Sequence, residues 1–552
     1  MSAKNKSSLV VLGAIVAFAV LSLCGCNSDQ SPQKASKEKT VTAAAWTLRD
    51  SISANLTGFD PIQIVDATTL NTLANCYEGL VVYNKQGDIV PGLAERWEIS
   101  QDRLVWTFHL KPNIRFHPWG DLPGFKHSGI LSAEDVVYSL VRCMTAPTSF
   151  NTWCLGDIVA RNADGTPAIS AVNPLTVSIR LKHPYALLNR LVSVAGWVYP
   201  AGIDKALGTG GLANKVVGTG PYRLDRFIPD DQIVLSSWEG YTGTRSTAAP
   251  SQVVIKIISD QLATFEAYRA GTLDMIRLDL DIIEAGRKYA KQQGDSLVSV
   301  AANQLDYLCM NMEKAPFDDP DLRAALAFSL DREKLTSLFK ETAIPAYGFL
   351  PPGNKGYMGE AVLRQSGFRY DPAEAKRHFQ AFLAKTKTKT PLHLKLVYDG
   401  GMMPELAVQF FKSSVESVLP ISIQLEKITW PELLQGSFNG AIAFHRMWWL
   451  VATPSDDVPF QFYMPGKNPP VGLNFSRYNN AAFAQRYLEV FSSGSAQEQI
   501  TGIHELEQTL IKDAVAIPLW HDQPVFMLRQ GLDVPIASTM RKFYAESTRK
   551  TN

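Results

Sequence analysis

The sequence has little of what enzymes and nucleic-acid-binding proteins depend on. Its 552 residues contain 54 Lys and Arg against 53 Asp and Glu, a net charge of +1, so it lacks the basic surface that binding to phosphate backbones requires. The short motifs of zinc proteases (HExxH), serine hydrolases (GxSxG) and P-loop nucleotide-binding proteins are also missing. These absences argue against a nucleic-acid partner and leave an enzymatic function without support.

Histidine and cysteine are too few and too scattered to indicate a metal site. His109, His117 and His127 follow one another at intervals of 8 and 10 residues, which match no short-spacing ligand pair. Four cysteines lie beyond the N-terminal segment, and none is part of a CxxC motif: Cys76, Cys143, Cys154 and Cys309. The sequence leaves open whether Cys143 and Cys154 form a disulfide or stay thiols. We expect no metal, no cofactor and no catalytic residue.

Long apolar runs are missing except at the N-terminus. Lys4 and Lys6 precede an uncharged stretch of 15 residues, 9–23, which is short for a membrane span but suits the core of a signal peptide. It ends in Leu23-Cys24-Gly25-Cys26, the pattern of a bacterial lipobox. This pattern predicts export, cleavage before Cys26 and lipidation of Cys26. An ordinary cleaved signal or a short membrane anchor is the alternative.

The remainder of the chain has the composition of a globular α/β protein. Polar residues 27–40 predict a flexible tether, after which stretches of strand and helix character alternate. Residues 104–110 (LVWTFHL) are rich in β-branched and aromatic side chains and predict a strand. Ser132 precedes two acids and a helical apolar pattern, and therefore predicts a helix N-cap. Pro320 and Asp321 predict the start of another helix.

Several short segments follow one another in a distinctive order. They are YEGLV at 77–81, PGLAERWE at 91–98, WTFHLKP at 106–112, SAEDVVYSLVR at 132–142, VGTGPY at 217–222, PFDDPDLRAAL at 316–326 and IPL at 517–519. In this order the segments resemble the extracellular solute-binding proteins of the peptide/nickel class of ABC importers, the family of oligopeptide- and dipeptide-binding proteins. Most of the matching residues suit a scaffold, so they indicate the fold better than the ligand.

The resemblance implies an α/β fold of two lobes, the periplasmic-binding-protein-like fold of class II type. An extra lobe is inserted, and the ligand cleft lies between the lobes. The implied division is a signal peptide and lipobox (1–26), a tether (27–40), a first lobe in three parts (41–77, 216–300 and 520–552), an inserted lobe (78–215) and an opposing lobe (301–519).

The resemblance also places a ligand-binding segment at residues 446–457. In peptide-binding members, a Trp there is followed by an acid that pairs with the α-ammonium group of the ligand. Alignment on Trp449 puts Ala452 at the position of that acid, and the nearest acids are Asp456 and Asp457. Because a buried unpaired ammonium group is costly, either these acids replace the missing one or the ligand has no free amino terminus.

Three further side chains of this segment are predicted ligand contacts. Trp448 and Trp449 are consecutive and face opposite ways on a strand, and the alignment favours Trp449 as the residue that lines the cleft. Arg446 is predicted to pair with a ligand carboxylate, the alternative being a surface charge. The predicted binding residues are therefore Trp449, Trp448, Arg446, Asp456 and Asp457.

The function that the resemblance implies is that of a lipid-anchored, monomeric substrate-binding protein of an ABC importer. It would capture a peptide or peptide-like solute by lobe closure, and deliver it to permease and ATPase subunits at the periplasmic or cell-surface face of a bacterial membrane. A metal chelate or another non-peptide solute is the alternative ligand. An extracytoplasmic chaperone or adhesin with the same fold, or an exported hydrolase, would belong to a different class.

Overall fold

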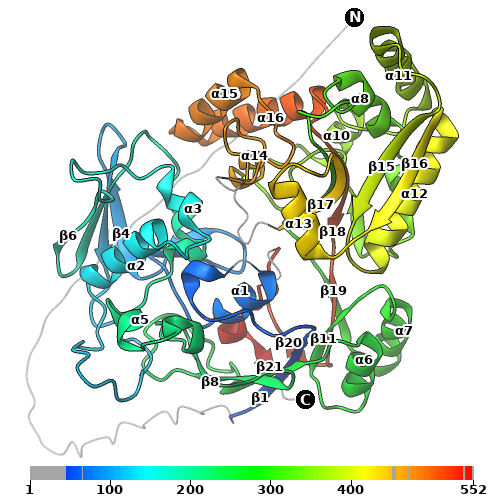
Figure 1. The fold of residues 1–552 in the computed structure, drawn as a ribbon. Coiled ribbons are helices and arrows are strands. Elements are labelled where there is room, and N and C mark those ends of the chain that lie inside the picture. The colour runs from blue at the N-terminus through cyan, green and yellow to red at the C-terminus, as the bar shows by residue number, and fades with distance from the viewer. Residues whose placement is uncertain (1–44, 65, 451–455, 470–471, 539–540, 550–552) are drawn as a thin grey trace, which may run out of the picture. The chain divides into compact units, whose positions relative to one another are not determined.

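The computed structural model describes residues 45–64, 66–450, 456–469, 472–538 and 541–549 (Figure 1). The predictions for Cys26, the tether and Ala452 lie outside these residues. Within the described part of the chain, no helix is both long and apolar enough to cross a membrane.

Two neighbouring sheets are assembled from segments that lie far apart in the sequence. In the first, β1 (Thr47–Ile52) runs parallel to β10 (Gln252–Ile257), which continues antiparallel into β9 (Gln232–Ser237) and β8 (Tyr222–Ile228). In the second, β19 (Val525–Leu528) lies between β11 (Met275–Leu278) and β12 (Ser296–Ser299). Residues near the start, the middle and the end of the chain therefore build one region.

A third sheet is formed by a continuous part of the chain. Its order is β4-β5-β7-β6, with β4 (Ala94–Ile99), β5 (Val105–Leu110), β7 (Thr176–Arg180) and β6 (Ile169–Asn173) all antiparallel. The helix α2 (Ala133–Thr145) packs against it. Its start confirms the predicted cap, because Ser132 and Asp135 form a reciprocal capping box.

The largest sheet has six strands. Its order is β14 (Ala343–Pro345), β18 (Ala516–Asp522), β13 (Gln304–Met310), β17 (Phe444–Leu450), β15 (Leu392–Tyr398) and β16 (Ile421–Lys427). The chain passes between this sheet and the three-stranded one twice, from β12 into β13 and from β18 into β19. These two short passages join the two regions.

Helices cover the sheets, and α8 begins at Pro320 as predicted, with Asp319 as its N-cap. Besides α2, the α-helices are α1 (Ala67–Leu73), α3 (Thr152–Gly156), α4 (Leu188–Leu191), α5 (Ile203–Ala206), α6 (Gln261–Arg269), α7 (Ile283–Gln293), α8 (Pro320–Phe328), α9 (Arg332–Ser337), α10 (Glu360–Ser366), α11 (Pro372–Thr386), α12 (Met402–Val418), α13 (Trp430–Phe438), α14 (Val458–Gln461), α15 (Ala481–Ser492) and α16 (Ala496–Lys512). Short two-stranded pairings join β2 (Val81–Tyr83) to β3 (Ile89–Pro91) and β20 (Leu532–Asp533) to β21 (Thr548–Arg549).

The four cysteines of the described chain are free thiols, and all four are buried. Of the two alternatives that the sequence left open for Cys143 and Cys154, the structure therefore has the thiols. Burial raises the pKa of the Cys143 thiol to about 12.

The GTGPY segment joins the start of β8 to the chain after α1 through close backbone contacts. The amide of Gly220 donates to the carbonyl of Cys76 at 2.9 Å, and the amide of His117 donates to the carbonyl of Gly218 at 2.7 Å. A Cβ atom on Gly218 would lie 2.1 Å from the Cys76 carbonyl oxygen, a backbone atom that has no freedom to move aside. Glycine is required here by space.

We predict that Gly218→Ala lowers the free energy of unfolding by about 1–3 kcal/mol or more, because the added methyl group forces the two backbone segments apart. Gly156→Ala is the matched control, since its Cβ would meet no atom within 4 Å. Thermal and urea unfolding of both variants measures the difference. Equal stability of the two variants would show that the segment relaxes without cost.

Candidate functional site

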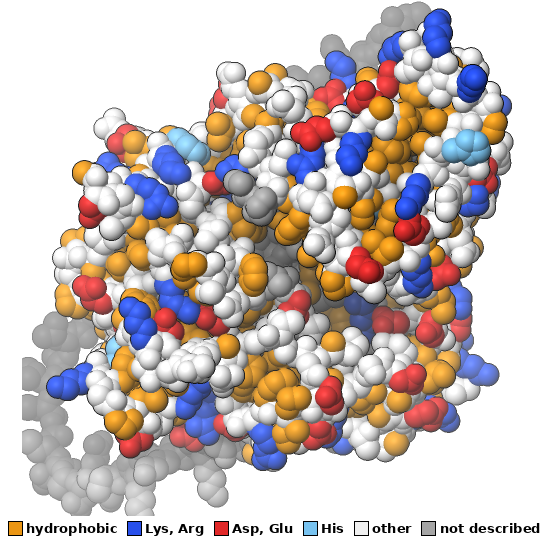
Figure 2. All heavy atoms as spheres, viewed as in Figure 1, with side chains coloured by type: hydrophobic (Ala, Val, Ile, Leu, Met, Phe, Trp, Pro, Cys, Tyr) orange, Lys and Arg blue, Asp and Glu red, His pale blue; other side chains and the backbone are white. Residues whose placement is uncertain are grey.

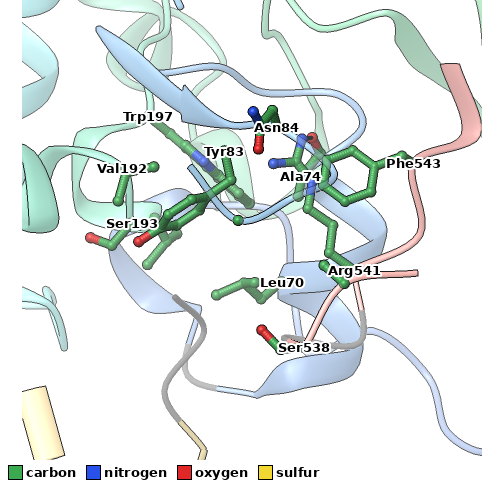
Figure 3. A pocket seen from close by; sticks show the side chains of 13 residues that line it. Leu70, Ala74, Tyr83, Asn84, Val192, Ser193, Trp197, Ser538, Arg541 and Phe543 are labelled. Atoms are coloured by element: carbon green, nitrogen blue, oxygen red, sulfur yellow. Dashed lines mark hydrogen bonds between the residues drawn. The ribbon is translucent and has the colours of Figure 1, made fainter. Parts of the chain in front are cut away.

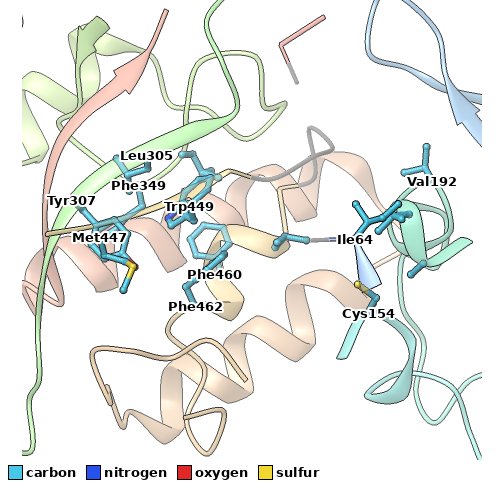
Figure 4. Close-up of a cluster of buried hydrophobic side chains, with 14 of the residues drawn as sticks. Ile64, Cys154, Val192, Leu305, Tyr307, Phe349, Met447, Trp449, Phe460 and Phe462 are labelled. Atoms are coloured by element: carbon cyan, nitrogen blue, oxygen red, sulfur yellow. The ribbon is translucent and has the colours of Figure 1, made fainter. Parts of the chain in front are cut away.

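The strand β17 carries three of the five predicted binding residues. Trp449 is 3 % exposed and stacks on Phe462, with ring centroids 5.7 Å apart. Figure 4 shows it among buried apolar side chains that include Leu305 and Phe460. Trp448 is only partly buried and stacks on Trp430 at 5.9 Å. The two rings thus lie in different surroundings, and ligand contact stays a prediction for both.

Arg446 lies inside the protein between two acids. It is 6 % exposed, pairs with Asp306 on the neighbouring strand β13, and lies 3.2 Å from the Asp399 carboxylate that follows β15. Its guanidinium also faces the ring of Trp520 at 5.9 Å. A ligand carboxylate would therefore have to compete with two protein carboxylates for Arg446.

Asp456 and Asp457 are also engaged with protein groups. Asp457 is fully buried, lies 2.6 Å from a guanidinium nitrogen of Arg190, and accepts a hydrogen bond from the hydroxyl of Tyr185. Asp456 accepts a hydrogen bond from the amide of Gly356 at 3.1 Å. Burial raises the pKa of Asp456 to about 6. Contact of either acid with a ligand stays a prediction.

A polar cavity of about 190 Å³ lies on one side of α1. The end of β1, the helices α1 and α6, the strands β11 and β19, and the residues Lys542 and Tyr544 line it. Two buried carbonyl oxygens at the cavity, on Asn71 and Gln261, have no hydrogen-bond partner among the described residues. Because an unpartnered buried acceptor is costly, a hydrogen-bond donor that reached either oxygen would be favourable.

Two ion pairs border the same cavity. Arg277, at the cavity wall, lies 2.7 Å from Asp279, and Lys542 pairs with the buried Asp50. The cavity therefore contains charged groups of both signs beside neutral hydroxyl and amide groups. Figure 2 shows that this face of the molecule is hollowed between the regions of α13 and α1, with charged side chains at the rim.

A smaller, more aromatic cavity of about 30 Å³ lies on the other side of α1 (Figure 3). Tyr83, Trp197 and Phe543 surround it, together with Arg541, which lies over the Phe543 ring at 4.8 Å. Its volume is that of about one water molecule. The consecutive cationic side chains of Arg541 and Lys542 thus lie at different cavities, on opposite sides of α1.

Acidic side chains gather where the two chain passages leave the six-stranded sheet. Asp522 ends β18, and Asp306 is the third residue of β13. Burial raises the pKa of Asp306, and the neighbouring Asp522 raises it further, while Arg446 acts in the opposite direction. Burial also raises the pKa of Asp522, and Arg277 at the cavity wall lowers it. These charges link the six-stranded sheet to the polar cavity.

Analysis of the sequence missed the residues of the polar cavity and the partners of Arg446. A usable signal was present: Asp306 and Arg277 are charged residues inside otherwise apolar strands, where an unpaired charge is unfavourable. Their partners are remote in sequence, so the pairing itself was not visible. Among the described residues, no group of three or more His, Cys, Asp or Glu is placed to hold a metal ion.

Two α/β regions joined by two chain passages, with a polar cavity next to the strand that follows one of them, define a two-lobed α/β binding protein. Comparison with known families identifies it further. Residues 88–469 match the model of the bacterial extracellular solute-binding proteins, family 5. The chain belongs to this family, which consists of solute-binding proteins of the peptide/nickel class of ABC importers, as the sequence resemblance predicted.

Relatives in this family match most of the length of the chain. A probable di/tripeptide-binding protein of Pseudomonas aeruginosa is 26 % identical over 508 residues, 88 % of this chain and 92 % of its own length. Heme-binding protein A of Haemophilus influenzae is 27 % identical over 529 residues, covering 92 % and 93 %. The structure of DppA of Helicobacter pylori in complex with the peptide STSA has a TM-score of 0.77 at 20 % identity, covering 92 % and 98 %. The fold prediction is confirmed.

Glu507 on α16 is a buried acid close to Asp456, and its protonation should make the stability of the protein depend on pH. It accepts hydrogen bonds from the amides of Phe349 at 2.6 Å and Leu350 at 3.0 Å. Burial raises its pKa from 4.5 to about 7. The folded state therefore holds the proton more tightly than the unfolded chain, and the associated stability is complete below pH 4.5 and lost as the pH rises through 7.

We predict that Glu507→Gln matches the wild-type stability near pH ~5, because an amide, like a protonated carboxyl, is neutral and offers an acceptor oxygen to the two backbone amides. Above pH ~8 the variant becomes the more stable protein by up to about 3 kcal/mol, since Gln cannot ionise. Thermal unfolding across this pH range measures the gap. Glu505→Gln is the exposed control on the same helix. A gap between wild type and Glu507→Gln that stays constant with pH would contradict the prediction.

Proposed function

We propose that this protein is the substrate-binding component of an ABC importer, and that it captures a peptide or peptide-like solute by closing its lobes and delivers it to a membrane permease. The observation that carries the proposal is the polar cavity next to the strand that follows one of the chain passages, in a chain of the solute-binding family. Relatives named for di- and tripeptides, and a structural neighbour that holds a peptide, support this ligand class.

The chemistry of the cavity suits a peptide. The unpartnered oxygens of Asn71 and Gln261 would accept hydrogen bonds from peptide N–H groups, and neighbouring Ser and Thr hydroxyls would serve either donors or acceptors. Arg446, Trp448, Trp449, Asp456 and Asp457 are the proposed wall on the side of the six-stranded sheet. In that wall, Asp457 would reach a ligand only by releasing Arg190.

A non-peptide solute is the second candidate. Asp456 and Asp457, the acids that would have to replace the missing partner of a peptide α-ammonium group, are both bound to protein groups, and Asp457 is fully buried. One relative of similar identity is named a heme-binding protein. A ligand without a free amino group would need neither acid.

We predict that a mixture of di- to tetrapeptides raises the melting temperature of the protein, and that native mass spectrometry detects a bound peptide. Gln261→Ala should weaken that binding about tenfold, because one hydrogen bond to the ligand is lost. Gln497→Ala, an exposed change on α16, is the matched control. No thermal shift with peptides, together with a shift caused by a heme or a metal chelate, would replace the peptide by the second candidate.

We also propose that the protein is exported, lipidated on Cys26, held at a bacterial membrane by that anchor, and monomeric. Replacing Cys26 by Ser should move the protein from the membrane fraction to the soluble fraction, because the acyl chains provide the membrane affinity. Incorporation of a labelled fatty acid and the mass of the mature protein measure lipidation. Cys24→Ser is the control and should stay lipidated. Membrane association that survives Cys26→Ser would contradict the proposed anchor.

A further inference from the structure

A buried polar network joins segment 78–215 to the region of the six-stranded sheet. Arg190 on α4 lies 2.6 Å from Asp457, the residue directly before α14. Arg190 also donates to the hydroxyl of Tyr185 at 2.8 Å, and this hydroxyl bonds both to Asp457 and, at 2.8 Å, to the hydroxyl of Tyr487 on α15. None of the four side chains belongs to a residue more than 3 % exposed.

The network divides cleanly between the two sides. Arg190 and Tyr185 come from segment 78–215, whereas Asp457 and Tyr487 come from the predicted opposing lobe, 301–519. If the two sides separated, the cation and one tyrosine would leave the anion and the other tyrosine. Four buried polar side chains would then exchange their partners for water at one step.

Other polar contacts surround the network and fix its register. Arg103 donates to the carbonyls of Ser492 at 2.5 Å and Ser493 at 3.1 Å, where a cation is favourable because the last carbonyls of α15 lack helical partners. Lys467 pairs with Asp157 at 2.7 Å, with the charges in the reverse direction. The ring of Trp153 faces the guanidinium of Arg190 at 5.6 Å.

Among the described residues, no β-ladder connects the β4-β5-β7-β6 sheet to the six-stranded sheet. The two regions therefore meet through side chains and individual hydrogen bonds rather than through shared strands. Figure 4 shows apolar contacts at the same place, with Cys154 and Val192 of segment 78–215 on one side of a buried cluster and Phe460 and Phe462 on the other. Apolar contacts tolerate small shifts, but the buried ion pair is satisfied in one docked position only.

We propose that Arg190 and Asp457 are positioning residues, which set the balance between the closed and open forms of the protein by fixing how the inserted lobe docks on the opposing lobe. This inference rests on the proposed function, which supplies the opening and closing of the lobes. The new element is the contact that controls this movement. Removal of one partner leaves a charge buried without compensation in the docked form but hydrated in the open form. The equilibrium between the two forms therefore shifts toward the open form.

The test measures the distance between the two regions in the ligand-free protein. Spin labels are placed on Cys introduced at Val172 of β6 and Leu488 of α15, both exposed, in the full chain with Cys24 and Cys26 replaced by Ser. The four cysteines of the described chain are buried and stay unlabelled. A label pair at Val362 and Leu488, both within the opposing lobe, is the reference distance.

Arg190→Met should raise the ratio of long to short distances about 100-fold, and Arg190→Lys should raise it less, because the charge is kept and only the paired geometry is lost. Arg190→Met combined with Asp457→Leu should restore the short distance, since no unpaired charge remains. Arg49→Met is the matched control: it breaks the Arg49–Asp274 pair, 2.7 Å long, within the first lobe. The reference distance should not change in any variant.

The proposal is overturned if Arg190→Met and Arg190→Lys lower the melting temperature but leave the distance distribution unchanged. If Arg190→Met fails to fold, Arg190→Lys and the double variant decide in its place. Peptide binding is measured separately on the same proteins. Absent binding with a normal response to Arg190→Met would overturn the proposed function alone, and normal binding with no response in distance would overturn this inference alone.

Discussion

A charge taken out of water must find a partner inside the protein, and this constraint accounts for several of the buried contacts between distant segments of this chain. Arg446 lies between Asp306 and Asp399, and Lys542 binds Asp50. Arg190 binds Asp457 across the contact between two regions. Each pair holds together segments that are far apart in the sequence. These buried charges therefore already have partners inside the protein, and a ligand group that approached one of them would compete with a protein group.

The sequence was most informative where structure is local. The cap at Ser132, the helix start at Pro320 and the strand after residue 104 depend on neighbouring side chains and were predicted correctly. The ordered segments also identified the fold, because residues such as Gly218 are required by backbone packing that any ligand specificity leaves unchanged.

The candidate site was less accessible to the same reasoning. The tryptophan pair was placed on a strand, and β17 is that strand, but which ring packs into the core depends on Phe462 and Trp430, contributed by other elements. The partner of Asp457 is Arg190, which lies in a different predicted lobe. The unpartnered oxygens of Asn71 and Gln261 are recognisable only once two helices are packed. Pairings between distant segments leave no local pattern.

The four buried thiols have a consequence for how the chain reaches its folded form. The thiolate is the species that oxidants attack, and burial raises the pKa of Cys76, Cys143, Cys154 and Cys309 alike. Once the chain is folded, burial shields these cysteines and keeps them as thiols, so their oxidation is slowed. Before folding they are exposed, and a bridge formed between any two of them would oppose the native packing. In an oxidising environment, folding of the chain competes with disulfide formation in the unfolded state. Faster burial of the four cysteines therefore gives a higher yield of native protein.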